Sequence, residues 1–508
     1  MALLDDAALA ARDASGPTET RRGKRTNWFA AFWRWHFYGS IIVIPVLLVL
    51  TISGMTYMFR AQIDDWTHPG VLTVSAPAGG ERLSLAEQEE AVRAAFPDRS
   101  ILSVTDNLEE RATVFVTDLH GESRNVYIDP FRAEVTGDLA PDQLVSDWAE
   151  RIHGTLLIGD TGDRIVELGA SWAIVLTITG FIIFFLGRRP RAGARAKGLR
   201  GARLRGTHAV VGLPVGLGIL LLVVSGLPWT GVWGEKAQNL AADNGTSFWG
   251  ADPGAESTLG DLIESADGKS GPAGWAVANG PTAESDPGAL APSGEPSTGD
   301  EDSGHAGHGS GGADPSPEWS GPTVSIDDAI AAAAQVGAPG PYFVTYPGDE
   351  RGVFSVFGWQ WSNNGNPAAS DVTQELTVHV DQYSGNVVGE YGYDDYSALA
   401  KTVSQGIALH EGRRFGAVNT VMTTVFCLAV IFMCISGPVM WWRRRGTASG
   451  LAAPRARLPI FGNWLLLIAV AALGVFLPLF GISLIAILLL DQLVIRRVPA
   501  MSRYFASA

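Results

Sequence analysis

The chain has 508 residues, which suggests about three domains, and it is 46% hydrophobic but only 18% charged. The apolar residues are concentrated in long runs with almost no charge. Such runs are typical of membrane helices and exclude a soluble enzyme. The net charge is −15, and residues 231–405 hold 25 Asp/Glu against 4 Lys/Arg. Because the largest non-membrane stretch is acidic, a nucleic-acid partner is also excluded.

Five apolar runs follow in chain order: Ile41–Met58, Ile174–Leu186, Val210–Leu227, Val418–Trp442 and Trp464–Ile495. Clusters rich in Arg and Lys lie before the first run, between the second and third, after the fourth and after the last. The positive-inside rule places all four clusters in the cytoplasm. The two long loops, at about 60–160 and 231–410, then face outside. The first run is long and starts late, so we expect a signal anchor and not a cleaved signal peptide.

The last apolar run is too long for one ordinary span, and a single span would place Arg496 and Arg497 outside. Pro478 and Gly481 stand midway and could turn a hairpin. We therefore expect six spans, the last two forming this hairpin.

The chain carries an internal duplication. His36 and His208 are each followed 18 positions later by the glycine of a Ser-Gly pair, and His153 and His410 are each followed by glycines 6 and 27 positions later. The outside loops repeat as well, because Asp129 and Asp381 each end an alternating strand and each precede a glycine by 8 residues. The repeated unit is therefore span, small α+β domain, span, with both copies starting inside.

Each outside domain is predicted to contain one helix and a β-hairpin. The helices, Ser84–Ala95 and Ser325–Ala334, both open with a capping pattern. The second domain also carries an insertion, roughly Ala251–Pro322, rich in Gly, Ser, Pro and acidic residues. Since this composition cannot bury a core, we expect a disordered segment.

Four histidines flank the four core spans at equivalent positions. A single histidine there would most simply be an interfacial residue, but two symmetric pairs favour function. Two imidazoles on opposite sides of one planar ligand are what a bis-histidine haem needs. Because the hydrocarbon core is about 30 Å thick, the pairing must join histidines of equal depth. We predict two haem b groups, one between His36 and His208 and one between His153 and His410.

The second of these pairs needs a break in its helix. A straight helix from His153 to Arg188 would span 35 residues, or about 52 Å, and would lift the histidine out of the bilayer. Asp160, Gly159 and Gly162 could break that helix and fold the segment back.

The remaining histidines are weaker candidates. His305 and His308, in the insertion, could form a weak copper, zinc or iron site, although ordinary low-complexity residues are the favoured interpretation. His68, His120 and His379 are interpreted as structural. No CxxC, dinucleotide or nucleotide-binding motif is present. Electrons would therefore have to come from a quinol or a separate reductase on the inner side.

The chain resembles the PepSY-associated transmembrane family, which includes iron-regulated membrane proteins and ferric-siderophore reductases. The resemblance covers about residues 28–500 apart from the insertion. It rests on Trp35-His36-Phe-Tyr-Gly39, Arg151-Ile-His153, Arg205-Gly-Thr-His208, Leu409-His410, the hairpins Tyr127-Ile-Asp129…Gly137 and His379-Val-Asp381…Gly389, and the ending Phe476-Leu-Pro-Leu-Phe-Gly481…Leu490-Asp491. It implies a bacterial cytoplasmic-membrane protein whose four histidines hold two b-type haems.

The predicted fold is an α-helical membrane protein with two small extracytoplasmic α+β domains, a duplicated unit and a C-terminal hairpin. The expected segments are a cytoplasmic tail 1–27, span 28–60, first domain 61–150, span 151–187, basic loop 188–206, span 207–231, second domain 232–405 with insertion 251–322, span 406–442, loop 443–459, hairpin 460–497 and tail 498–508.

The leading hypothesis is one-electron transfer across the membrane to a ferric siderophore or chelate outside, in iron acquisition. The alternative is a non-catalytic membrane anchor or sensor that binds a partner protein or peptide. A transporter is a third interpretation, but the core spans carry almost no buried charge for a substrate.

Overall fold

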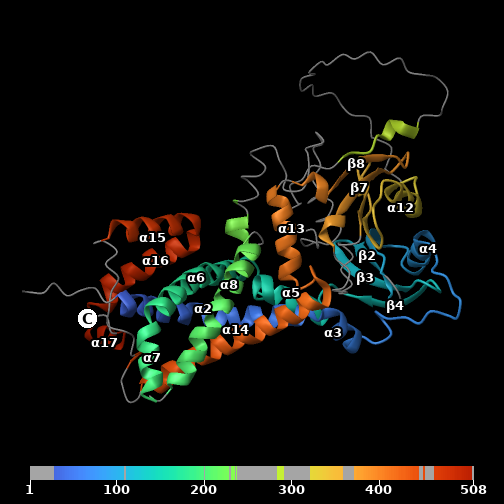
Figure 1. Ribbon diagram of the computed structural model, residues 1–508. Coiled ribbons are helices and arrows are strands. Elements are labelled where there is room, and N and C mark those ends of the chain that lie inside the picture. The colour runs from blue at the N-terminus through green and yellow to red at the C-terminus, as the bar shows by residue number, and fades with distance from the viewer. Residues whose placement is uncertain are drawn as a thin grey trace, which may run out of the picture.

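In the computed structural model the chain forms a helical part and a β-sheet part that lie end to end (Figure 1). The structure describes residues 28–107, 110–198, 201–227, 230–234, 236, 283–290, 321–358, 371–396, 398–445, 450–451 and 463–505. All statements below concern these residues.

The helical part is built on four long apolar helices. They are α2 (Trp28–Met58), α6 (Gly159–Leu186), α8 (Ala202–Gly226) and α14 (Gly416–Arg445). Helices α2 and α8 each contact both α6 and α14, so the four form a closed bundle. Its core contains Val43, Trp172, Val215 and Val430. Most other apolar side chains of these helices point outward, as expected where lipid replaces water as the solvent.

The C-terminal stretch bends once, at Leu477, between α15 (Trp464–Phe476) and α16 (Pro478–Leu490). Proline at the first position of α16 starts that helix without losing a hydrogen bond. Gly474 and Gly481 let the two helices approach closely, and Trp172 of α6 contacts Phe480 and donates to Ser483. The predicted turn is confirmed.

The number of spans differs from the prediction of six. Among the described residues, five helices are long and apolar enough to cross a membrane, the fifth being Pro478–Ile495. Helix α15 has only 13 residues, or about 20 Å, which is shorter than the roughly 30 Å hydrocarbon core.

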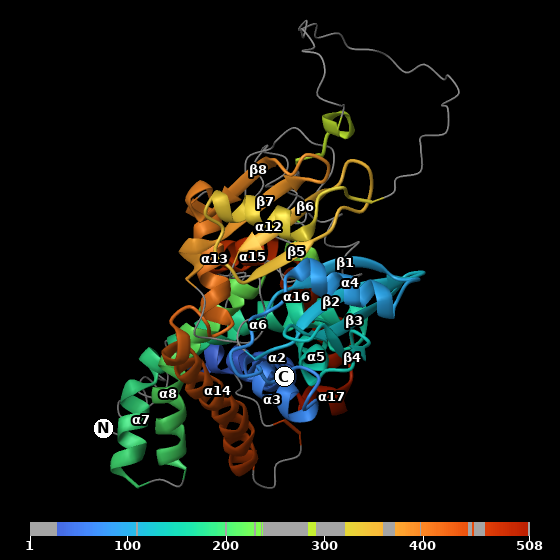
Figure 2. The same cartoon turned by 90° about the vertical axis from the view of Figure 1, so that its right-hand side faces the viewer.

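The sheet part holds eight antiparallel strands in one sheet. They are β1 (Ser100–Thr105), β2 (Thr113–Leu119), β3 (Glu122–Asp129), β4 (Glu134–Leu139), β5 (Tyr342–Thr345), β6 (Val353–Gly358), β7 (Leu376–Asp381) and β8 (Val387–Gly392). Their order is β4-β3-β2-β1-β5-β6-β7-β8 (Figure 2). Both predicted hairpins are present, as β3–β4 and β7–β8.

The two outside domains expected from the sequence are joined in one sheet, because β1 and β5 pair. Ser103, Val104 and Thr105 face Thr345, Val344 and Phe343. One core cluster then runs through both halves. An unpaired inner edge on either half would expose backbone donors and acceptors, and pairing the two edges satisfies them. Hydrophobic patterning predicted the strands of the two hairpins, but not β1, β2, β5 and β6 or which edge meets which.

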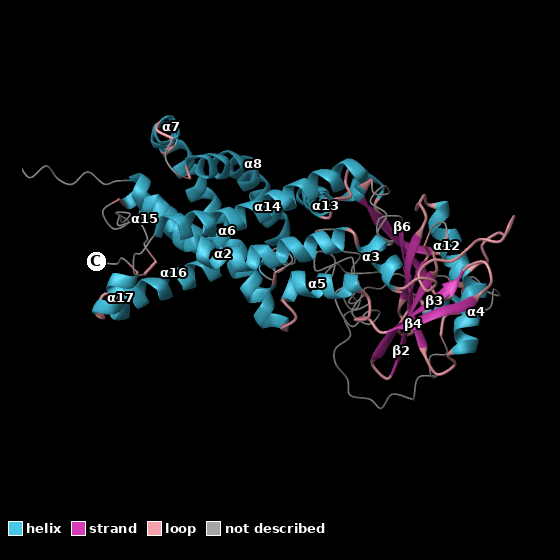
Figure 3. Cartoon of the chain, turned by 90° about the horizontal axis from the view of Figure 1, so that it is seen from below, coloured by secondary structure: helices cyan, strands magenta, loops and turns pink. Residues whose placement is uncertain are grey.

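Two capped helices cover one face of the sheet, and the helical part lies toward the other (Figure 3). These helices, α4 (Leu85–Ala95) and α12 (Ile326–Gln335), are capped by Ser84 and Ser325, as predicted. The Asp327 carboxylate accepts hydrogen bonds from the Leu85 and Ala86 amides at 3.0 and 3.1 Å. A side chain of the second half thus caps the helix of the first.

Shorter helices connect the two parts: α3 (Arg60–Thr67), α5 (Val145–Thr155) and α13 (Ala398–His410). At the other end lie α7 (Arg188–Ala196) and α17 (Pro499–Tyr504). Short 3₁₀ turns cover Pro287–Leu290, Val372–Gln374 and Tyr393–Asp395, and a π-helical turn covers Asp491–Ile495.

Part of the predicted disordered insertion is ordered against the sheet. Ser285 donates from its amide to Arg351 and from its hydroxyl to Gly352, and the Asp286 amide donates to the Asp381 carboxylate at 2.7 Å. Most of the rest of residues 251–322, including His305 and His308, lies outside the described residues.

Candidate functional site

Two helix breaks fold histidine-bearing helices back onto the bundle. Between α5 and α6 the chain turns through Leu156 and Leu157, with φ of +50° and +62°, and α6 begins at Gly159 with φ of +58°. Between α13 and α14 the turn uses Gly412 and Gly416, with φ of +77° and +56°. The predicted break between α5 and α6 is confirmed at Gly159, whereas Asp160 and Gly162 lie inside α6. The two breaks bring α5 against α2 and α13 against α8.

These breaks bring His153 and His410 together. Their ring centroids lie 6.2 Å apart and their planes are inclined by 85°. Both are the histidines nearest the sheet among the four candidates, so they are called the sheet-side pair. Two imidazoles at this distance can bind one atom or group between them.

Each ring of the sheet-side pair packs against two consecutive residues of a facing helix, a serine followed by a glycine. Such a pair is called a step below. His153 Nδ1 lies 3.0 Å from the Leu50 carbonyl oxygen and 3.2 Å from Ser53 Oγ. A Cβ atom added at Gly54 would stand only 3.0 Å from His153 Cε1. The glycine therefore makes room for the ring.

His410 is held in the same way by α8. Its Nδ1 lies 3.0 Å from Ser225 Oγ, and the Ser225 hydroxyl donates to the Leu222 carbonyl oxygen at 3.1 Å. A Cβ atom at Gly226 would lie 3.5 Å from His410 Cε1, an ordinary contact distance.

The other two candidates, His36 and His208, lie near the arginine-rich end of the bundle and are called the arginine-side pair. His36 Nδ1 lies 2.9 Å from the Leu176 carbonyl oxygen and 3.3 Å from Thr179 Oγ1. His208 Nδ1 lies 2.7 Å from Ser436 Oγ.

A shared sequence signal explains these contacts, and the sequence reasoning missed its role. The supporting steps read Leu50-Thr-Ile-Ser-Gly54, Leu176-Thr-Ile-Thr-Gly180, Leu222-Val-Val-Ser-Gly226 and Met433-Cys-Ile-Ser-Gly437. The hydroxyl residue and the carbonyl three positions before it hold the imidazole. The fourth step departs from the pattern, because the nearest atom to a Cβ at Gly437 belongs to Ile44.

The hydrogen bonds fix which ring nitrogen is available. A carbonyl oxygen only accepts, so Nδ1 of His36 and His153 must carry the proton. The Ser225 hydroxyl donates to Leu222, so it accepts from Nδ1 of His410. In the neutral ring Nε2 then keeps its lone pair, the form that binds a metal. Burial and, to a lesser extent, the neighbouring His410 lower the pKa of His153 to about 4, so the ring is neutral at pH 7.

The other histidines among the described residues do not join this site. His379 on β7 is buried and bonded to Ser355 Oγ at 2.9 Å, whereas His68 contacts Thr67 and His120 forms the β2–β3 turn. Within the described residues no group of three or more His, Cys, Asp or Glu could hold a metal ion.

The expectation of almost no charge buried in the spans needs one correction. Glu167 of α6 is only 1% exposed. Its carboxylate accepts hydrogen bonds from the Val232 and Trp233 amides at 3.0 and 3.2 Å. Glu167 thus anchors the segment after α8, a structural role.

A comparison with known families decides the identity at the family level. The pattern of the PepSY-associated TM region matches residues 33–444. The chain belongs to this family. The match includes all four candidate histidines and their serine–glycine or threonine–glycine steps. No curated protein sequence matches the chain.

Proposed function

We propose that this PepSY-TM protein carries electrons across the membrane through two haem b groups and reduces a ferric chelate on the sheet side. The sheet-side pair carries the proposal. A metal–nitrogen bond of about 2 Å, with about 1.1 Å from ring nitrogen to ring centre, sets two axial imidazoles about 6 Å apart. The ring centroids of His153 and His410 lie 6.2 Å apart, so their spacing would suit two histidines that hold one haem.

The chemistry of the donors supports the same conclusion. The residues that would hold haem are His153 with His410 and His36 with His208. Haem would supply a reversible one-electron iron couple. The protein keeps the imidazoles neutral by burial and orients them through the serine and threonine hydroxyls and the leucine carbonyls.

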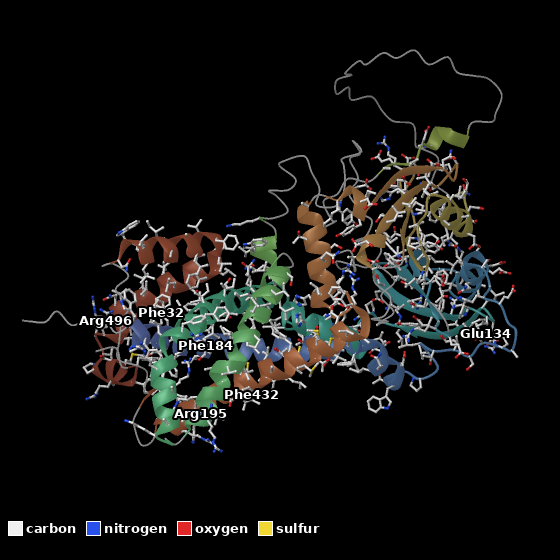
Figure 4. All side chains as sticks on the ribbon, viewed as in Figure 1. Phe32, Glu134, Phe184, Arg195, Phe432 and Arg496 are labelled. Carbon is white, nitrogen blue, oxygen red and sulfur yellow. The ribbon has the colours of Figure 1, made fainter. Side chains whose placement is uncertain are left out.

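We further propose the direction of transfer from the distribution of charge. Arg195 and Arg496 lie at the end of the bundle opposite to Glu134 on the sheet (Figure 4). The positive-inside rule then puts the arginine-side pair near the cytoplasm and the sheet outside. An inner quinol or reductase would donate electrons, and Fe(III) held in a siderophore or other chelate would accept them. Reduction weakens the chelate and releases Fe(II).

We also propose that the chain arose by duplication of a span–domain–span unit. The strand order mirrors about the β1–β5 contact. The same contacts also recur in each half. A hydroxyl group on the first span contacts the histidine that precedes the second span, and a hydroxyl group on the second span contacts the histidine of the first span. Two equivalent units side by side give two stacked histidine pairs.

The test is a difference spectrum. Protein purified in detergent after haem-supplemented expression should give a low-spin b-type spectrum on dithionite reduction, with near two haems per chain. His153→Ala and His36→Ala should each remove one haem, whereas His68→Ala, outside both pairs, should remove none.

Anaerobic addition of a ferric chelate should then reoxidise the reduced protein. A featureless spectrum would overturn the proposal and favour a non-catalytic membrane anchor whose sheet part binds a partner. Haem that survives loss of all four histidines would refute the assignment of the ligands.

A further inference from the structure

Charged side chains gather beside the sheet-side pair, where α13 meets the sheet. Glu411, directly after His410, forms an ion pair with Arg413. The guanidinium groups of Arg413 and Arg60 overcome the effect of burial and hold the pKa of Glu411 below its usual range. Glu411 and Arg413 therefore stay charged and nearly neutralise each other.

Glu375 is the third acid of this junction and differs from Glu411. It stands directly before β7 and is only 6% exposed. Its carboxylate accepts a hydrogen bond from Ser404 Oγ at 2.5 Å and another from the Tyr396 hydroxyl. Ser404 belongs to α13, the helix that ends at His410. Glu375 thus ties the sheet to the helix that carries one of the proposed ligands.

The surroundings of Glu375 leave its charge finely balanced. Burial raises the pKa of this carboxyl to about 7, although Ser404, Arg413 and Tyr396 oppose the shift and Glu411 adds to it. Nearby Arg414 is drawn instead to Asp371, at 3.8 Å. A small change of charge close by is therefore enough to add or remove a proton here.

We propose that Glu375 couples electron transfer at the sheet-side pair to the uptake of one proton. This inference rests on the proposed function. When an electron from the inner donor reaches the sheet-side pair, the Glu375 carboxylate takes one proton from the outer solution. When the electron passes to the ferric chelate, the carboxylic acid returns that proton to the solution.

Distance and dielectric support this coupling. Ser404 lies six residues from His410 in one helix, or about 9 Å along its axis. An added negative charge at this range, across a buried junction, favours the neutral form of a carboxyl. Proton uptake in turn stabilises the reduced state, so the reduction potential should fall as pH rises.

The experiment is a redox titration of the haem-loaded, full-length protein in detergent between pH 6 and 8. His208→Ala removes the arginine-side haem, so the redox transition that remains belongs to the sheet-side haem. The potential of the sheet-side haem should fall with pH, with a limit of ~59 mV per tenfold change in proton concentration. Glu375→Gln keeps the size of the side chain and should flatten this dependence. The control is Glu390→Gln, which changes an exposed carboxylate on β8.

The outcomes separate this inference from the proposed function. The inference alone would be overturned if the protein binds two haems but the reduction potential on the sheet side does not change with pH. It would also be overturned if this potential depends on pH equally in Glu375→Gln and in the unmodified protein. Absence of haem would overturn both. If Glu375→Gln loses its spectrum, Ser404→Ala supplies the second test, because it removes a donor to the carboxylate and should move the pH-dependent region upward.

Discussion

At the residue scale, the supporting glycines distinguish two otherwise equivalent sites. Gly54→Ala would place a Cβ 3.0 Å from His153 Cε1, whereas Gly226→Ala would place one 3.5 Å from His410 Cε1. The first ring must shift and the second need not. Pushing a ring off its rotamer costs about 1 kcal/mol, or roughly fivefold in an equilibrium constant.

We therefore expect Gly54→Ala to weaken haem retention at the sheet-side pair about fivefold and Gly226→Ala to leave it nearly unchanged. Competition for haem by apomyoglobin, followed by absorbance, measures this retention. Equal losses of haem in the two variants would show that the glycines do not act by leaving room for the ring.

The four candidate histidines were singled out from the sequence because their spacing to later glycines occurs twice. The contacts that support the rings could not be predicted in the same way, although the Ser-Gly and Thr-Gly steps are evident in the sequence. A step on one helix and a ring on another are related only by packing, which spacing along the chain does not encode. For the same reason Glu375 carried no signal, since its importance arises where α13 meets the sheet.

At the element scale, glycines set the helix breaks that place the sheet-side pair. Gly416 starts α14 with φ of +56°, a left-handed conformation that costs other residues about 1–2 kcal/mol. Gly416→Ala should therefore lower the midpoint of thermal unfolding by roughly 2–8 °C. Differential scanning fluorimetry in detergent measures this shift.

The control for Gly416→Ala is Gly154→Ala. Gly154 lies inside α5, and an added Cβ would meet no atom within 4 Å. Alanine there should be neutral or stabilising by up to about 1 kcal/mol. If both substitutions shift the midpoint equally, the left-handed conformation is not what Gly416 contributes. The sequence predicted the first break because a straight helix would have been too long for the bilayer.

At the scale of the whole molecule, one sheet joins the two halves of the β part. The individual hairpins were predicted because strand periodicity and turn residues are local. Their union was not, because pairing of β1 with β5 joins residues more than 200 positions apart, such as Val104 and Val344. Two small domains can each bury little surface, and a shared core gains burial for both.

This union predicts cooperative unfolding across the halves. Val344 is fully buried in the shared core, so Val344→Asp should cost several kcal/mol by burying a charge without a partner. Hydrogen exchange should then rise in β2 and β3 of the first half as well as in β6 and β7 of the second. Val388→Asp, at an exposed site on β8, should change neither. An increase in hydrogen exchange that is confined to the second half would mean that the halves fold independently. In that case β1–β5 pairing would be a contact between two domains, and His153 and His410 would be brought together by the membrane helices alone.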